Sequence, residues 1–129
     1  MSANEQKKFT FTLLGEVRSK KNSRRNIVRG GRKYSVPSEA HESWHEEASL
    51  QLYKMKCPKF KGQVAIEITF VTGTKAKADL TNKAESIMDL LVDHEIIKDD
   101  NVFVLGKVTL IFGGVEPKNP HTRIMIEGV

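Results

Sequence analysis

The sequence has one cysteine, Cys57, and no stretch of 18 apolar residues. A single thiol cannot form a disulfide within the chain, so we expect a protein of a reducing compartment, the cytoplasm. The polar start MSANEQKK lacks the apolar core of a signal peptide. These absences disfavour a secreted protein and a protein that spans a membrane.

Sequence motifs for nucleotide binding are also missing. No G-x-x-x-x-G-K-[ST] occurs, and Gly30-Gly31 does not open a helix as a dinucleotide-binding fingerprint would. We therefore expect no nucleotide cofactor. Cys57 precedes Pro58 and has no histidine at a fixed spacing, so we expect a packing or surface thiol and not a nucleophile.

The formal net charge of +5 hides two segments of opposite sign. The first, Val17–Pro37, has no acid and eight basic residues: Arg18, Lys20, Lys21, Arg24, Arg25, Arg29, Arg32 and Lys33. The second, Asp79–Asp100, has seven acids against Lys83 and Lys98. Basic surfaces attract nucleic acid, and clustered carboxylates come close to phosphate only with a divalent cation between them. Charge alone leaves open a flexible basic arm beside a solvated acidic helix.

Hydrophobic periodicity predicts one compact α/β (α+β) domain over residues 1–129, with a mixed β-sheet, two main helices and the order β(β)αβαββ. Strands are expected at Phe9–Leu14, Gln63–Val71, Val102–Phe112 and Thr122–Glu127. Helices are expected from Ser38 to before Pro58 and from about Leu80 to Val92. The basic residues at about 17–37, with a short strand at Arg32–Val36, predict a long hairpin or a mobile arm.

His41-Glu42-Ser43-Trp44-His45 matches H-E-x-x-H within the first predicted helix. On one helix face two such histidines can bind zinc while the glutamate serves as a general base. A third ligand is needed, and the other histidines, His94 and His121, stand at no recognisable spacing. We expect an amphipathic helix whose histidine pair lies beside Trp44, and a small zinc hydrolase is the less favoured interpretation.

The segment KADLTNKAESIMDLLVDHEIIKDDN has the most specific pattern. Asp79 stands where a loop enters the second predicted helix, and Asp99-Asp100 stand in the turn beyond that helix. Asn82 and Glu85 have the spacing of a capping box, which would leave Asp79 free to bind metal. We expect the return of the chain to bring Asp99-Asp100 near Asp79. The alternatives are that Asp79 caps the helix and that Asp99-Asp100 lie in a solvated turn.

This segment resembles the RusA family of Holliday-junction resolvases, mostly phage or prophage endonucleases. The family signature runs D-[LIV]-D-N, then a helix ending in D-x-L, then D-D before a strand. Asp79, Asn82, Asp89 and Asp99-Asp100 fall at its spacing without a gap. The preceding S-K-K-N-S, the basic segment and the S-V-P-S-E-A helix start are similar to the family's layout, so the likeness covers most of the chain.

The resemblance implies a homodimeric, Mg²⁺-dependent endodeoxyribonuclease, with Mn²⁺ as an alternative metal, in a bacterial or phage-infected cell. Such an enzyme nicks paired strands of a four-way DNA junction during recombination and repair. By that correspondence Asp79 and Asp100 are metal ligands and Asp99 supports them. Contacts with DNA phosphates are expected from basic residues: Lys20, Lys21, Arg24, Arg25, Arg29, Arg32, Lys33, Lys75 and Lys77.

Two positions depart from the family signature. Its second carboxylate is Thr81 here, and the lysine usual six residues after the first aspartate is Glu85. On a helix, Thr81, Glu85 and Asp89 share one face. We therefore expect Glu85 to supply the missing metal-ligating carboxylate and Lys83 or Lys77 to supply the catalytic cation. The alternative is a weakened resolvase that still binds branched DNA.

Overall fold

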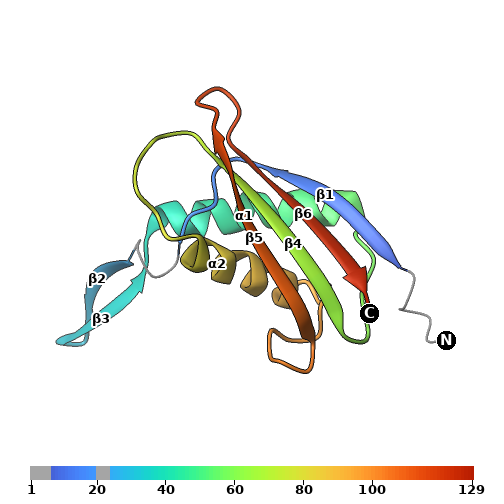
Figure 1. Cartoon of the computed structure of the whole chain (residues 1–129). Helices are drawn as coiled ribbons and strands as arrows, with labels where there is room; N and C mark the ends of the chain where they lie inside the picture. The colour runs from blue at the N-terminus through green and yellow to red at the C-terminus, as the bar shows by residue number, and fades with distance from the viewer. Residues whose placement is uncertain (1–6, 20–23) are drawn as a thin grey trace.

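The centre of the computed structural model, which describes residues 7–19 and 24–129, is a mixed four-stranded sheet in the order β1-β6-β4-β5 (Figure 1). Its strands are β1 (Lys8–Leu14), β4 (Val64–Thr72), β5 (Leu105–Val115) and β6 (His121–Gly128). β6 pairs antiparallel with β1 and β4, and β4 pairs parallel with β5. The mixed sheet and its helices confirm a single small α+β domain.

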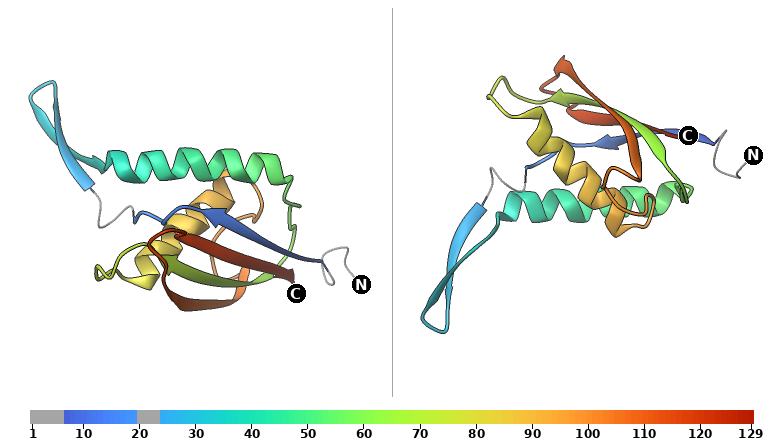
Figure 2. Two further views of the ribbon diagram at one scale, coloured as in Figure 1. Left: turned by 90° about the horizontal axis from the view of Figure 1, so that it is seen from above. Right: turned by 60° about the horizontal axis from the view of Figure 1, so that its bottom comes forward.

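Two helices, α1 (Glu39–Met55) and α2 (Leu80–Asp93), lie on the same side of the sheet (Figures 1 and 2). α1 begins where Ser38 Oγ accepts a hydrogen bond from the His41 N–H at 3.2 Å, as a good N-cap residue does. The alternating residues Val64, Ile66 and Ile68 of β4 are buried in the core between sheet and helices. No helix in the described parts of the chain is long and apolar enough to cross a membrane.

The basic segment forms a separate two-stranded hairpin of β2 (Arg24–Arg29) and β3 (Arg32–Pro37). Gly30 and Gly31 close it with positive φ angles of 57° and 78°, which the tight turns of hairpins require. The hairpin projects from the body near the start of α1 (Figures 1 and 2). Of the two arrangements expected for this segment, the structure has the hairpin.

β5 begins at Leu105, not at Val102 as the sequence pattern predicts. The reason is a turn made by Asn101, whose Oδ1 accepts from the Phe103 N–H at 2.9 Å. Its main-chain oxygen accepts from the N–H groups of Val104 and Leu105. The apolar residues at 102–104 continue the hydrophobic run of the strand, so hydrophobicity alone does not separate the turn from the strand. At its other end, β5 extends beyond the predicted boundary to Val115.

Candidate functional site

Asp79 is the N-cap residue of α2, and its backbone is extended, with φ −85° and ψ 125°. Its carboxylate makes no hydrogen bond to the N–H groups at the helix start. Instead, Oδ2 accepts a hydrogen bond from Asn82 Nδ2 at 3.1 Å. The predicted capping box is wrong in its position, because the helix begins at Leu80, ahead of Asn82. The Asp79 side chain is exposed and available to a ligand.

Asp99 and Asp100 lie in an exposed turn after α2, and their two carboxylates differ in their hydrogen bonds and surroundings. Asp99 Oδ1 accepts from the Asp100 N–H at 2.8 Å, and its Oδ2 accepts from Asn101 Nδ2 at 3.1 Å. These hydrogen bonds, with that of the Asp100 N–H the strongest cause, lower the pKa of the exposed Asp99 carboxyl. Asp99 therefore shapes the turn, while the side chain of Asp100 faces solvent.

Asp79 is the N-cap residue of α2, whereas Asp100 lies in the turn that follows the C-terminal end of this helix. The helix has 14 residues, so its length is about 20 Å. After it the chain stays at the C-terminal end, where the Ile96 N–H donates to the Leu91 carbonyl at 2.9 Å. Across residues 7–19 and 24–129, no group of three or more His, Cys, Asp or Glu is placed to hold a metal ion. The expected metal ligands thus do not gather within one chain.

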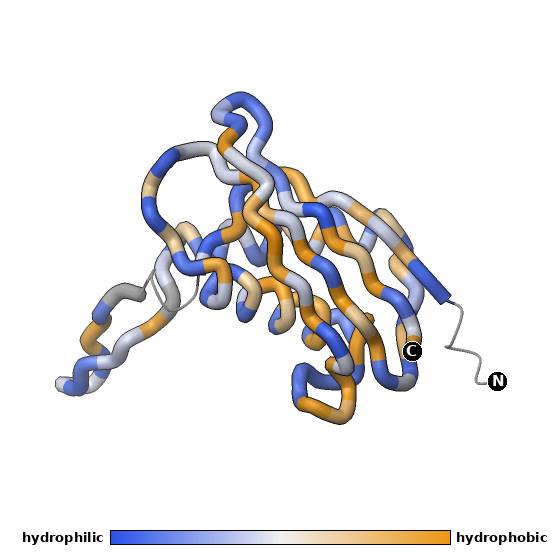
Figure 3. Tube along the Cα trace, in the orientation of Figure 1, coloured by the Kyte–Doolittle hydropathy of each residue, from blue (hydrophilic) through white to orange (hydrophobic). Residues whose placement is uncertain are grey.

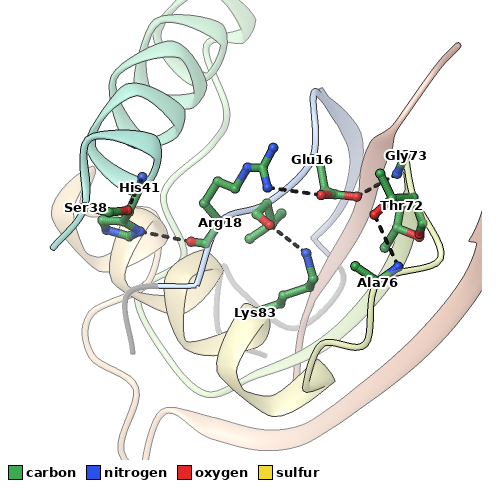
Figure 4. Close-up of polar contacts among 10 residues, drawn as sticks. Glu16, Arg18, Ser38, His41, Thr72, Gly73, Ala76 and Lys83 are labelled. Carbon is green, nitrogen blue, oxygen red and sulfur yellow. Dashed lines mark hydrogen bonds and ion pairs between the residues drawn. The ribbon is translucent and has the colours of Figure 1, made fainter. Parts of the chain in front are cut away.

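Lys83 and Glu85 have different surroundings on α2. Glu85 is exposed, whereas Lys83 is buried, with 6% of its surface exposed. Lys83 Nζ donates to the carbonyl oxygen of Val17 at 2.7 Å (Figure 4). Burial lowers the pKa of the Lys83 ammonium, Glu16 opposes that shift, and Arg18 adds to it. The lysine expected to act as a catalytic cation is therefore engaged with the protein main chain.

Residues 16–19, which precede the hairpin in the chain, make hydrogen bonds to α1, to α2 and to the loop after β4. Figure 4 shows those that involve His41 and Gly73. Glu16 Oε1 accepts from the Gly73 N–H at 2.6 Å, and its Oε2 lies 3.5 Å from Arg18 Nη1. Ser86 Oγ donates to the Arg18 carbonyl at 2.9 Å, and His41 Nδ1 donates to the same oxygen at 2.9 Å. Sequence reasoning missed Glu16, whose only signal is an acid between a glycine and the basic segment.

The H-E-x-x-H histidines make contacts within the fold. His41 holds the Arg18 carbonyl, and His45 Nε2 lies 3.0 Å from Asp93 Oδ2 on α2. The His41 and His45 rings lie 5.9 Å and 6.3 Å from the Trp44 ring, as an amphipathic helix predicts. Both histidines line a cavity of about 710 Å³ between α1 and α2. Asp89, which matches the family signature, also lines this cavity.

The described basic residues that are expected to contact DNA lie on the hairpin and in the loop before α2. Lys20 and Lys21 lie outside the described residues, and Arg24 and Arg25 belong to β2. Arg29, Arg32 and Lys33 have exposed side chains on the hairpin. Lys75 and Lys77 are exposed in the loop that leads to Asp79. Positive charge therefore lies on the projecting hairpin and immediately before the candidate carboxylate.

The sequence model of one protein family, described as Endodeoxyribonuclease RusA, matches residues 15–127. The matched range includes the hairpin, Asp79 and the Asp99-Asp100 turn, and it covers nearly the whole chain. Among curated proteins, none matches this sequence.

Proposed function

The chain belongs to the RusA family of endodeoxyribonucleases, and from this premise we propose that it is a divalent-metal-dependent enzyme that resolves four-way DNA junctions. It would hydrolyse one phosphodiester bond in each of two paired strands. The observation that carries the proposal is the state of Asp79, an exposed carboxylate that makes no hydrogen bond to the N–H groups at its helix start. Lys75 and Lys77 precede it in the same loop.

DNA binding in this proposal depends on the basic hairpin. Arg29, Arg32 and Lys33 are exposed there, and arginine and lysine bind phosphate oxygens without reading the base sequence. A projecting ribbon suits the separated arms of a branched DNA better than a flat surface does. Glu42, Glu46, Asp89 and Asp93 line the cavity between α1 and α2, so phosphate is repelled from that face.

Asp79 and Asp100, with Glu85 as a third carboxylate, are the proposed ligands of Mg²⁺ or Mn²⁺. Carboxylate oxygens are the ligands that these hard cations prefer, and a bound ion would act as a Lewis acid on the phosphodiester. Within one chain, however, Asp79 is the N-cap of α2, whereas Asp100 lies in the turn beyond the C-terminal end of that helix. These residues of a single chain therefore do not fit one shared ion, and the proposal requires a homodimer.

A cleavage assay on a labelled four-way junction tests the proposal, with a linear duplex of the same sequence as the control. In Mg²⁺ or Mn²⁺ we expect symmetric nicks in two opposing strands of the junction and none in the duplex or in EDTA. Asp79→Asn should remove the nicks and leave junction affinity unchanged, because phosphate contacts do not depend on that carboxylate. Equal cutting of duplex and junction would contradict the proposed substrate.

A second candidate is a RusA-like protein that binds junctions without cutting them. It is favoured by Thr81, which stands where the family signature has its second carboxylate, because a hydroxyl is a poorer metal ligand than a carboxylate. Tight junction binding with no nicks in either metal would support this candidate and exclude the enzyme.

A further inference from the structure

The loop between β4 and α2, residues 73–78, carries two lysines and leads directly to Asp79. Residues 74–79 are all exposed, so burial in the core does not fix the position of the loop. Figure 3 shows the loop as a wide arch between the end of β4 and the start of α2, in hydrophilic and near-neutral colours. The path of the loop, and with it the place of Asp79, therefore depends on polar contacts.

One hydrogen bond of this loop reaches a distant part of the sequence. The Gly73 N–H donates to Glu16 Oε1 at 2.6 Å, across 57 positions (Figure 4). Two further hydrogen bonds are local: Thr72 Oγ1 donates to the Thr74 carbonyl at 2.9 Å, and the Ala76 N–H donates to Thr74 Oγ1 at 3.3 Å. Local hydrogen bonds give a loop its shape, whereas a bond to another segment fixes where the loop lies. The bond to Glu16 is of the second kind.

Glu16 is itself held in place by the residues on either side of it. The Gly15 N–H donates to the Pro120 carbonyl at 2.9 Å. Val17 is buried, with 1% of its surface exposed, and its carbonyl accepts from Lys83 Nζ at 2.7 Å. The Glu16 side chain is 14% exposed, and a carboxylate so enclosed needs hydrogen-bond donors. Glu16 is thus a fixed, charged acceptor for the start of the loop.

The loop and residues 16–19 line a common cavity of about 180 Å³. Glu16 and Arg18 contribute to its wall, as do Lys77 and Ala78, which immediately precede Asp79. Atoms that face a void lack the close contacts that hold a packed surface in place. Without the bond from Gly73 to Glu16, the loop would have room to move into this space, and Asp79 would move with it.

Glu16 has a second partner in Arg18, whose Nη1 lies 3.5 Å from Glu16 Oε2. The Arg18 side chain is 51% exposed, and an ion pair open to water contributes little to stability. The pair is also longer than a good charge-assisted hydrogen bond, whereas the bond from Gly73 is short. Of the two contacts, the hydrogen bond from Gly73 is therefore the one that restrains the loop.

We propose that Glu16 is a positioning residue, which fixes the loop before α2 so that Asp79 and the two lysines keep the geometry that cleavage needs. Glu16 acts through Gly73 and touches neither the metal nor the DNA. An acid beside the basic segment opposes phosphate binding, so DNA affinity does not account for a carboxylate at this place. The consequence for cleavage rests on the proposed function, whereas the restraint on the loop does not.

Hydrogen exchange measured by NMR tests the restraint without any measurement of activity. In Glu16→Ala the amides of Gly73 and Ala76 should exchange at least about fivefold faster than in the wild type, because the loop has lost its fixed acceptor. In Glu16→Gln the side-chain oxygen still accepts the bond, so exchange should stay within about twofold of the wild type. Glu127→Ala, at an exposed position of β6, is the control. Unchanged exchange in Glu16→Ala, or equally fast exchange in both Glu16 variants, would overturn the proposal.

Single-turnover cleavage of a four-way junction tests the positioning role. At saturating junction, Glu16→Ala should cut at least about tenfold more slowly, since small displacements of a reacting group are costly. Its junction affinity should equal or exceed that of the wild type, because an acid has been removed, and Glu16→Gln should restore most of the rate. Equal losses of rate and affinity in Glu16→Ala would overturn the positioning role. Faster exchange with undiminished cutting would refute that role alone, and a wild-type protein that cuts no junction would refute the proposed function alone.

Discussion

The ammonium of Lys83 donates a hydrogen bond to the carbonyl oxygen of Val17 at 2.7 Å, across 66 positions of sequence. This contact joins the helix that begins after Asp79 to the segment that leads into the basic hairpin (Figure 4). Lys83 is buried, and a buried ammonium is stable only where it is paired or hydrogen-bonded. The start of α2 and the segment that precedes the hairpin are therefore held together by a buried hydrogen bond.

Replacement of this ammonium should weaken the fold. Lys83→Met leaves the Val17 carbonyl without its donor, and the loss of a hydrogen bond from a charged group costs about 1.5–3 kcal/mol. Part of that cost is offset because the variant no longer buries a charge, so we expect a loss of about 1–2 kcal/mol in the free energy of unfolding. Urea denaturation measures it. Glu85→Gln is the control on the same helix, and an equal loss there would contradict the role given to Lys83.

Glu85 is expected to replace the carboxylate that Thr81 lacks. Glu85→Gln keeps the size of the side chain and removes its charge, so junction nicking should fall by at least about tenfold while junction affinity stays the same. Single-turnover cleavage and a gel-shift titration measure the two quantities. Glu47→Gln, at an exposed position of α1, is the matched control. Undiminished nicking by Glu85→Gln would show that this carboxylate does not act at the site.

The hairpin arginines should contribute affinity through phosphate contacts. Arg29→Ala with Arg32→Ala should weaken junction binding and reduce the slope of log K against log salt concentration by about 2, because each phosphate contact contributes about 0.9. Binding titrations at several salt concentrations give this slope. Lys118→Ala, at an exposed position of the β5–β6 turn, should leave it unchanged. An unaltered slope in the arginine variant would show that Arg29 and Arg32 do not contact the DNA phosphates.

The thiol of Cys57 should react slowly near neutral pH. Burial raises the pKa of Cys57 to about 11, and the opposing effect of Lys7 is smaller. Since the thiolate is the reactive form, the rate of alkylation by iodoacetamide should still rise about tenfold per pH unit between pH 8 and pH 10. Mass spectrometry measures the rate. The urea-unfolded chain is the control, because its thiol should approach a plateau near pH 9. A plateau at that pH in the folded protein would contradict the raised pKa.

The local elements could be predicted because each depends on a local pattern. The alternation of Val64, Ile66, Ile68 and Phe70 predicts β4, and the spacing of Ala84, Ile87, Met88 and Leu91 predicts α2. The start of β5 could not be predicted in this way. It depends on hydrogen bonds to Asn101 within an apolar run.

The family could be predicted from the sequence, whereas the arrangement of the candidate site residues could not. The spacing of Asp79, Asn82 and Asp99-Asp100 leads to the family, which the match over residues 15–127 confirms. The spacing of residues along the sequence does not show near which end of α2 the turn with Asp100 lies. We expected Asp79 and Asp100 to lie close together, and within one chain they do not. The burial of Lys83 could not be predicted from the sequence either, because its hydrogen-bond partner Val17 lies far away along the chain.

The proposed function requires a homodimer in which Asp79 of one copy and Asp100 of the other would hold one ion, and subunit mixing tests this requirement most directly. Asp79→Asn and Asp100→Asn proteins should each fail to nick a four-way junction. After exchange of subunits, each mixed dimer should have one site with both substitutions and one site with none, so nicking should return, with one cut per junction. Native mass spectrometry verifies that mixed dimers form. Mixed dimers that remain inactive would contradict the account, because the two carboxylates would then not act across the interface.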